Sequence, residues 1–175
     1  MTSSDRARED RSRLNVEGAW TKGPFKIAGE ANWMDVRMSR FVAGLPSSSF
    51  EDDVNLGAYY VEGLWVATGE DASGTFGRRK VAKNFLDGDG CGQVELALRF
   101  GQIWVDDSVF NNGFANPSRS TPGYDHWTVG GNWWLNPYIR FSVNYFRNEF
   151  WQPFEINGKV DDHEQGVLTR FQIDF

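Results

Sequence analysis

Apolar and polar residues alternate along most of this chain, and that alternation limits the folds open to it. In residues 93–100 (QVELALRF) every second residue from Val94 onward is apolar, and most residues between them are polar. Residues 139–145 and 167–175 repeat the pattern. Because successive side chains of a β-strand point to opposite faces, this period of two predicts strands with one apolar and one polar face.

The same pattern predicts seven strands in all. A disordered leader is expected before them, because residues 1–11 are polar, highly charged and without alternation. Residues 12–175 are then one all-β, antiparallel domain. The predicted strands lie near residues 13–20, 25–36, 54–68, 92–105, 124–135, 138–147 and 164–175.

The connections between the predicted strands differ in length. Tight turns are predicted at 21–24 and 136–137, where Gly, Pro and Asn supply the turn geometry. Residues 37–53, 106–123 and 148–163 are predicted as long polar loops. Short turns that alternate with long loops are typical of a transmembrane β-barrel of the outer-membrane porin type.

Aromatic residues are frequent, although the chain is polar on average. Phe, Trp and Tyr make up 15% of the residues, and the mean hydropathy is −0.52. A disordered segment would be poor in aromatic residues, and no apolar run is long enough for a transmembrane helix. Aromatic residues near the predicted strand ends, such as Trp20, Phe25 and Trp133, are typical of the aromatic girdles of membrane barrels.

A soluble β-barrel or β-sandwich that binds a ligand is the alternative, because its strands would alternate in the same way. The C-terminal strand favours the membrane interpretation. Phe171, Ile173 and Phe175 fall on its apolar face, and the strand ends on the aromatic Phe175. A terminal aromatic strand is typical of bacterial outer-membrane proteins.

Charge and motifs argue against other classes of function. The formal net charge is −6, whereas a nucleic-acid-binding surface is basic. Cys91 is the one cysteine, so the sequence predicts no disulfide framework and no cysteine metal cluster. His126 has no partner at metal-binding spacing, and no catalytic or nucleotide-binding motif occurs. We therefore predict neither an enzyme nor a cofactor.

Six ordered blocks of sequence, between about residue 12 and the end, are similar to one known family. No block is a generic turn motif. On these blocks the chain resembles the phosphate-selective porin O and P family. They are EGAW at 17–20 with KGPF at 22–25, GE at 29–30, GAYYVEGLW at 57–65 with TGE at 68–70, VELALRF at 94–100, TVGGNWWLNP at 128–137 and TRFQIDF at 169–175.

The resemblance implies a sixteen-stranded outer-membrane porin, often trimeric, that passes anions such as phosphate. It covers the C-terminal part of such a barrel, and seven is odd, whereas single-chain bacterial barrels have even strand numbers. We therefore expect a fragment whose missing part carries the signal peptide, or a truncated product that closes no pore. The expected location is the bacterial outer membrane. The expected partners are its lipid, small anions, a homotrimer and the barrel-assembly machinery, which would contact Phe175.

If the apolar face meets lipid, the alternate positions face the pore, where rings of charge select ions. Basic residues there are candidate anion contacts, although Arg–Glu pairs on neighbouring strands also serve stability. The chain has more acidic than basic residues, so selectivity for phosphate stays open. The candidate pore-lining residues are Arg99, Arg140, Arg170, Lys26, Arg13, Glu95 and Glu62, with Asn15, Glu17, Glu30, Asn32, Asn144 and Asp174 at the other polar positions.

Overall fold

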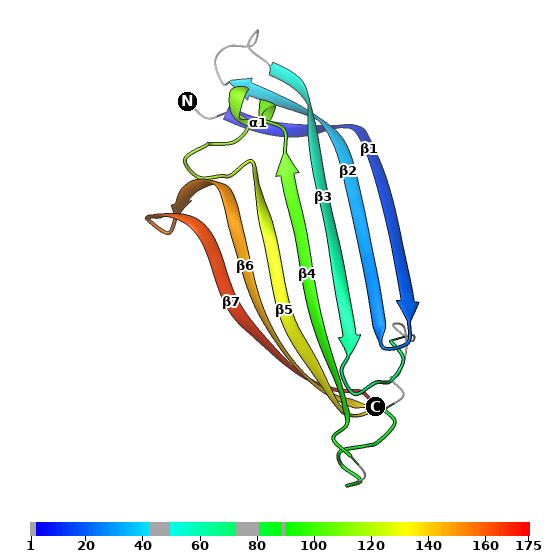
Figure 1. Cartoon of the computed structure of the whole chain (residues 1–175). Coiled ribbons are helices and arrows are strands. Elements are labelled where there is room, and N and C mark those ends of the chain that lie inside the picture. The colour runs from blue at the N-terminus through cyan, green and yellow to red at the C-terminus, as the bar shows by residue number, and fades with distance from the viewer. Residues whose placement is uncertain (1–2, 43–49, 73–80, 89) are drawn as a thin grey trace.

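The computed structural model describes residues 3–42, 50–72, 81–88 and 90–175. Its strands form one antiparallel sheet, in which each strand pairs with the next along the chain (Figure 1). Helix α1 lies at the upper end of Figure 1 and the C-terminus at the lower end. The elements are β1 (Ser3–Lys22), β2 (Phe25–Val42), β3 (Phe50–Val66), β4 (Gln93–Val105), α1 (Ser108–Asn111), β5 (Gly123–Asn136), β6 (Ile139–Ile156) and β7 (Lys159–Ile173).

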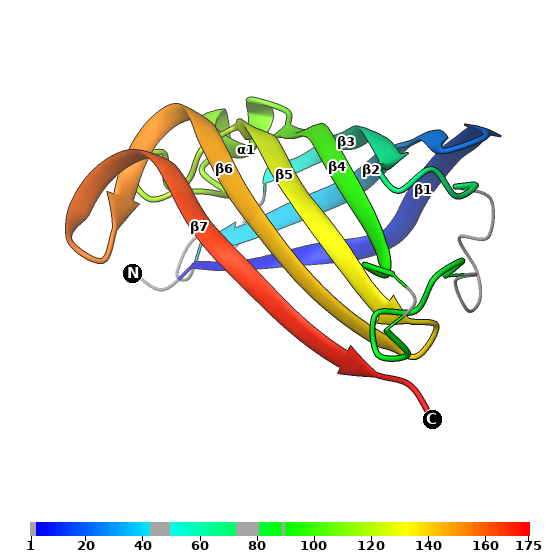
Figure 2. The same cartoon turned by 60° about the horizontal axis from the view of Figure 1, so that its bottom comes forward.

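The sheet curves into an open trough, with β1 and β7 along its two edges (Figure 2). Within the described part of the chain, each of these two strands pairs on one side. No helix among the described residues is long and apolar enough to cross a membrane. The curved sheet therefore carries nearly the whole architecture.

The pairing register gives the sheet two chemically different faces, because residues directly opposite each other point to the same side. Val61, Phe100 and Trp127 are successive partners across β3, β4 and β5 and lie on one face. The next residues along β3 and back along β4, Glu62 and Arg99, are partners on the other face. We call these the apolar face and the polar face. The predicted alternation is confirmed.

The apolar face has a band of limited height. On β2 it is free of charged residues from Phe25 to Trp33 and becomes charged at Asp35. On β5 it is free of charge from Trp133 to Trp127. At about 3.3 Å per residue these stretches rise about 20 to 27 Å. That height matches the apolar band around outer-membrane barrels, which is about 25 Å tall.

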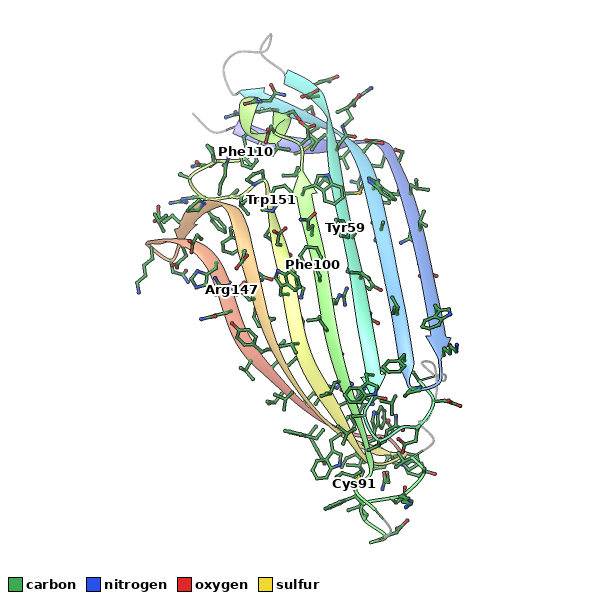
Figure 3. All side chains as sticks on the ribbon, viewed as in Figure 1. Tyr59, Cys91, Phe100, Phe110, Arg147 and Trp151 are labelled. Atoms are coloured by element: carbon green, nitrogen blue, oxygen red, sulfur yellow. The ribbon has the colours of Figure 1, made fainter. Side chains whose placement is uncertain are left out.

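Aromatic rings lie at both ends of the apolar band. At the upper end the ring centroids of Tyr59 and Phe100 are 6.2 Å apart, and those of Phe100 and Trp127 are 4.4 Å apart (Figure 3). At the lower end Phe85, from the connection between β3 and β4, packs edge-on against Trp133 at 5.1 Å. The two rows of rings have the arrangement of aromatic girdles.

Above the upper row of rings, the same side of the sheet carries charged residues. Arg37 Nε donates a hydrogen bond to Asp53 Oδ1 at 2.9 Å, and this bond, with the charge of Arg37, holds the pKa of Asp53 below its usual range. Arg147 Nε lies 2.9 Å from Glu149 Oε1. The apolar band therefore ends at this height.

The long loop predicted at residues 148–163 is wrong. Strand β6 continues to Ile156 and β7 begins at Lys159, so Asn157 and Gly158 alone make the turn. Both have positive φ, 51° and 81°, as the two-residue hairpin turn of the Asn-Gly type requires. The side-chain alternation stops above the apolar band, because polar and aromatic residues are mixed there without a period of two, while the backbone pairing continues.

The disordered leader predicted at residues 1–11 is also corrected. Strand β1 begins at Ser3 and pairs with β2, with a register shift between Ala7 and Arg11. Backbone hydrogen bonds to β2 extend the sheet where the side chains show no alternation. The predicted loop 37–53 is shorter for the same reason, since β2 reaches Val42 and β3 starts at Phe50; residues 43–49 lie outside the described residues.

The predicted long connection 106–123 is confirmed and contains α1. Its first residue is fixed to β3, because Asp106 N donates to the carbonyl of Asn55 at 2.9 Å. Its second half is fixed to β6, because Glu155 N donates to the carbonyl of Ser118 at 2.9 Å. Between these points Asn112 Nδ2 donates to Asp52 Oδ2 at 2.6 Å. The connection therefore bridges the upper ends of β3 and β6.

Candidate functional site

The polar face holds all the residues that the sequence marks as candidate pore-lining positions. Glu62 lies opposite Arg99, Glu95 opposite Asn132, and Arg170 opposite Ser142. The register relates the other strands in the same way, so one face of the sheet collects side chains from β1 to β7. The candidates on this face are Arg13, Lys26, Glu62, Glu95, Arg99, Arg140 and Arg170.

Burial indicates which face lies on the inside of the curve. Side chains crowd together on the inside of a curved sheet and spread apart on the outside. Glu95 and Ser142 on the polar face are 1% and 5% exposed, whereas Leu98 and Val129 on the apolar face are 53% and 54% exposed. The polar face is therefore the inner side of the trough.

Carboxamides hold one carboxylate of this face in place on β1 and β2. Glu30 Oε1 accepts hydrogen bonds from Asn15 Nδ2 at 2.6 Å and from Asn32 Nδ2 at 3.0 Å. Asn15 Nδ2 also lies 2.6 Å from Asn32 Oδ1. The network therefore holds the three polar side chains at positions 15, 30 and 32 together across β1 and β2.

Arg99 is held by an aromatic ring. Its guanidinium carbon lies 3.6 Å from the centre of the Tyr60 ring, a distance typical of a cation–π contact. Glu62, directly opposite Arg99, is 3.6 Å from Lys26 Nζ. Stacking on a ring face restricts the guanidinium plane of Arg99 and leaves its N–H donors, which lie in that plane, free of the ring.

Glu95 and Arg140 lie near the lower end, in the most buried part of the polar face. Glu95 accepts hydrogen bonds from Gln93 and Asn132, both at 3.0 Å. Arg140 lies over the Trp134 ring at 4.9 Å and donates to Gln172 Oε1 at 2.6 Å.

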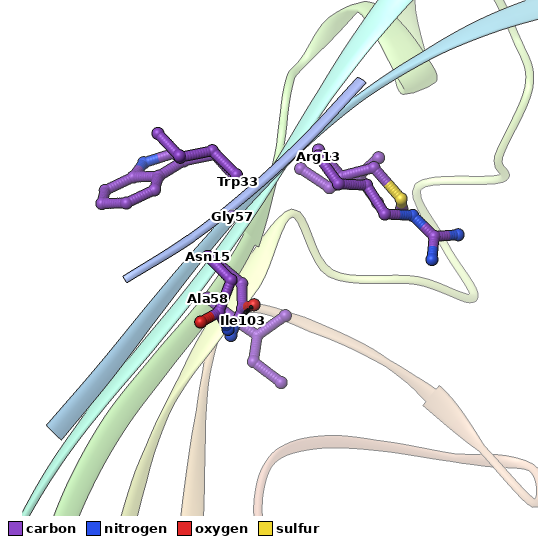
Figure 4. A pocket seen from close by; sticks show the side chains of 10 residues that line it. Arg13, Asn15, Trp33, Gly57, Ala58 and Ile103 are labelled. Atoms are coloured by element: carbon purple, nitrogen blue, oxygen red, sulfur yellow. Dashed lines mark hydrogen bonds between the residues drawn. The ribbon is translucent and has the colours of Figure 1, made fainter. Parts of the chain in front are cut away.

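Two other candidate arginines are exposed. Arg170 lies near the outer edge of the sheet on β7. Arg13 borders an open hollow of about 450 Å³ that Asn15, Ala58 and Ile103 also line (Figure 4). In Figure 4 Arg13 and Trp33 lie on opposite sides of the strands. Arg13 and Arg170 are thus the candidates most accessible to a solute.

The charged candidate residues do not give the polar face a net positive charge. Acidic side chains are interleaved with the basic ones on the same strands. The basic members are Arg13, Lys26, Arg99, Arg140 and Arg170, and the acidic members are Glu17, Glu30, Glu62, Glu95 and Asp174.

His126 belongs to a hydrogen-bonded chain that the sequence does not reveal. His126 Nδ1 is 2.6 Å from Asn148 Oδ1, and its Nε2 is 2.7 Å from Thr128 Oγ1. Asn148 Nδ2 donates to Glu164 Oε2 at 3.2 Å. Most of these partners come from neighbouring strands, so only the register brings them together.

Several aromatic residues lie on the polar face and not in the girdles. Tyr60, Tyr124, Phe146 and Phe150 are partners of polar-face residues. For Tyr60 the sequence contains a signal. Adjacent residues of a strand point to opposite faces, and its neighbour Tyr59 lies on the apolar face. The assignment of aromatic residues to girdles alone is therefore incomplete.

Comparisons with known proteins agree with this architecture. A family model described as "Phosphate-selective porin O and P" matches residues 2–175. Porin O of Pseudomonas aeruginosa is 25% identical over 168 residues, which cover 95% of this chain and 36% of that porin. The chain therefore spans little more than a third of the length of this relative.

Proposed function

The chain belongs to the phosphate-selective porin O and P family, and on that premise we propose that it forms part of the wall of an outer-membrane porin through which small anions such as phosphate diffuse passively. Its seven-stranded antiparallel sheet would be a section of the barrel wall. The polar face would line the pore and the apolar face would meet lipid. No covalent chemistry is part of this function.

The observation that carries the proposal is the separation of charge between the two faces. Every charged candidate lies on the inner, polar face, opposite a band that has the height of a membrane's hydrocarbon layer. Large apolar side chains of that band, among them Leu98, Val129 and Phe171, are 53%, 54% and 61% exposed. A soluble protein rarely exposes so large a contiguous apolar surface.

The expected partners follow from the same arrangement. The lipid would contact the apolar band and its two rows of aromatic rings. Phe175 is fully exposed beyond the end of β7, which leaves it accessible to the barrel-assembly machinery. A homotrimer is the expected assembly, in the outer membrane of a Gram-negative bacterium. The net charge of −6 makes a nucleic acid an unsuitable partner.

Bilayer recordings of the full-length protein test the anion role. Replacing Arg99, Arg140 and Arg170 with Ala should lower the anion-to-cation permeability ratio, measured from the reversal potential in a salt gradient. A unit charge about 4 Å from an ion in water contributes about 1 kcal/mol, or about a fivefold change in ratio at low salt. Arg147→Ala, on the outward side above the band, is the control. An unchanged ratio in the triple variant would refute the anion role.

A soluble ligand-binding barrel or sandwich is the competing proposal, and cell fractionation separates the two. We expect the protein in the detergent-insoluble outer-membrane fraction, with a gel mobility that changes on heating. Recovery as a soluble monomer would contradict the porin proposal.

A further inference from the structure

Aromatic rings follow one another along β5 and β6 on the polar face. The centroids of Phe154 and Phe150 are 4.8 Å apart, and those of Phe150 and Tyr124 are 6.3 Å apart. Further down, Phe146 stacks on the imidazole of His126 at 6.5 Å with an interplanar angle of 23°. We call Phe154, Phe150, Tyr124 and Phe146 the aromatic file. The aromatic file begins at the upper end of the sheet and runs down the polar face. Its lower end is level with the apolar band, which lies on the other face of the sheet.

The lower end of the aromatic file lies at the same height as Arg99, with β5 between them. Thr128 is the cross-strand partner of Arg99 on one side and of Phe146 on the other. A guanidinium group thus lies in the same cross-strand row as the last ring, two strand spacings or about 10 Å away along the sheet.

A hollow of about 320 Å³ opens at this point, lined by Tyr60, Arg99, Tyr124 and His126. Its floor is Gly101, which lies between its partners Tyr60 and His126. A Cβ on Gly101 would lie 2.8 Å from the carbonyl oxygen of Tyr59 and 3.2 Å from Cβ of Tyr60. The absence of a side chain at this position therefore creates the hollow and lets β3 and β4 approach closely.

The chemistry of the hollow differs from that of a site for a small inorganic anion. Such an anion is bound by converging positive charges and N–H donors, and aromatic rings supply neither. Here Arg99 is close to the acidic Glu62 and Tyr60 contacts Glu30, so net positive charge is small. Rings provide flat apolar surface for stacking, which an aromatic or similarly flat solute would use.

We propose that the aromatic file and the hollow over Gly101 guide organic anions that combine a carboxylate with a flat ring, the ring moving along the file and the carboxylate binding Arg99. This inference rests on the proposed function, in which the polar face lines a pore, and names a substrate class for that pore. His126 borders the same hollow, but both of its ring nitrogens are engaged by Asn148 and Thr128, so Arg99 supplies the contact to the carboxylate.

Block of the single-channel chloride current by benzoate tests the inference, with acetate and inorganic phosphate as comparison anions. In the full-length protein the half-blocking concentration of benzoate should be about tenfold below that of acetate, because ring stacking adds to the shared carboxylate contact. Tyr124→Leu and Phe150→Leu keep apolar volume but remove a ring. Each should raise the benzoate value about three- to tenfold and leave acetate unchanged.

Two control variants accompany these measurements. Tyr124→Phe keeps the ring and should keep the benzoate block. Phe141→Leu removes a ring from the apolar face and should also leave it unchanged. Heat-dependent gel mobility checks that each variant is folded.

The outcomes separate the two proposals. If the wild-type protein conducts anions but benzoate and acetate block it at equal concentrations, the ring-selective path is wrong and the anion-porin proposal stands. This comparison uses the wild-type protein alone, so it does not depend on the folding of a variant. If benzoate blocks strongly but the two Leu variants bind it unchanged, the aromatic file is not the path and the inference falls. A protein that forms no anion-conducting channel would overturn both proposals.

Discussion

Single arginines on the polar face differ in how firmly they are held. Arg99 and Arg140 stack on the rings of Tyr60 and Trp134, whereas Arg13 and Arg170 are exposed. A stacked guanidinium keeps its N–H donors but loses side-chain freedom, so it contributes to the fold as well as to the charge of the face. Sequence spacing predicted the charge and the face of these residues, but the stacking partners depend on which strands are neighbours.

Arg140→Ala is expected to destabilise the protein more than Arg170→Ala. Arg140 donates a 2.6 Å hydrogen bond to Gln172 and covers Trp134, and loss of a hydrogen bond from a charged donor costs about 1.5 to 3 kcal/mol. Arg170 is exposed and should cost less than about 0.5 kcal/mol. Urea titration of the protein folded in detergent micelles measures both values. Equal midpoints for the two variants would show that the contacts of Arg140 are not stabilising.

At the scale of the strand, the sequence predicts structure well only where the two faces differ. Between Phe25 and Trp33 one face is apolar and the other polar, so alternation reveals the strand. Between residues 148 and 156 polar and aromatic residues follow one another without a period of two, so alternation disappears although β6 continues. The turn residues Asn157 and Gly158 carried the missing signal, because an Asn-Gly pair favours a two-residue hairpin.

The β6–β7 turn gives a prediction for this element. Gly158 has φ of 81° and open space around it, so Gly158→Ala should be strained by its backbone alone and cost about 1 kcal/mol. Gly63→Ala is the matched control, because Gly63 also has open space but no positive φ. Hydrogen exchange of the hairpin amides should increase in Gly158→Ala and not in Gly63→Ala. Similar exchange in both variants would argue against the strained turn.

At the scale of the whole molecule, the alternation of side chains along each strand predicted that all the candidate residues share one face of the sheet. The prediction holds because a period of two is fixed by backbone geometry. It predicted none of the contacts on that face. Tyr60 with Arg99, and His126 with Asn148, meet through the register between strands. Register depends on the turns and on backbone pairing across long distances in sequence, so side-chain alternation carries no information about it.

The division of the molecule into a lipid side and a water side makes neighbouring residues respond oppositely to the same substitution. Val143 lies on the apolar face and Asn144 on the polar face, one position apart on β6. An arginine near the middle of the apolar band costs about 2 to 4 kcal/mol in a membrane barrel, so Val143→Arg should fold poorly into lipid vesicles. Asn144→Arg adds the same charge to the inner face, where Gly130 opposite leaves room, and should fold nearly as well as wild type. The folded fraction is measured by heat-dependent gel mobility after refolding into vesicles. Equal losses for the two variants would mean that the two faces do not meet different solvents, and the assignment of lipid and pore sides would be untenable.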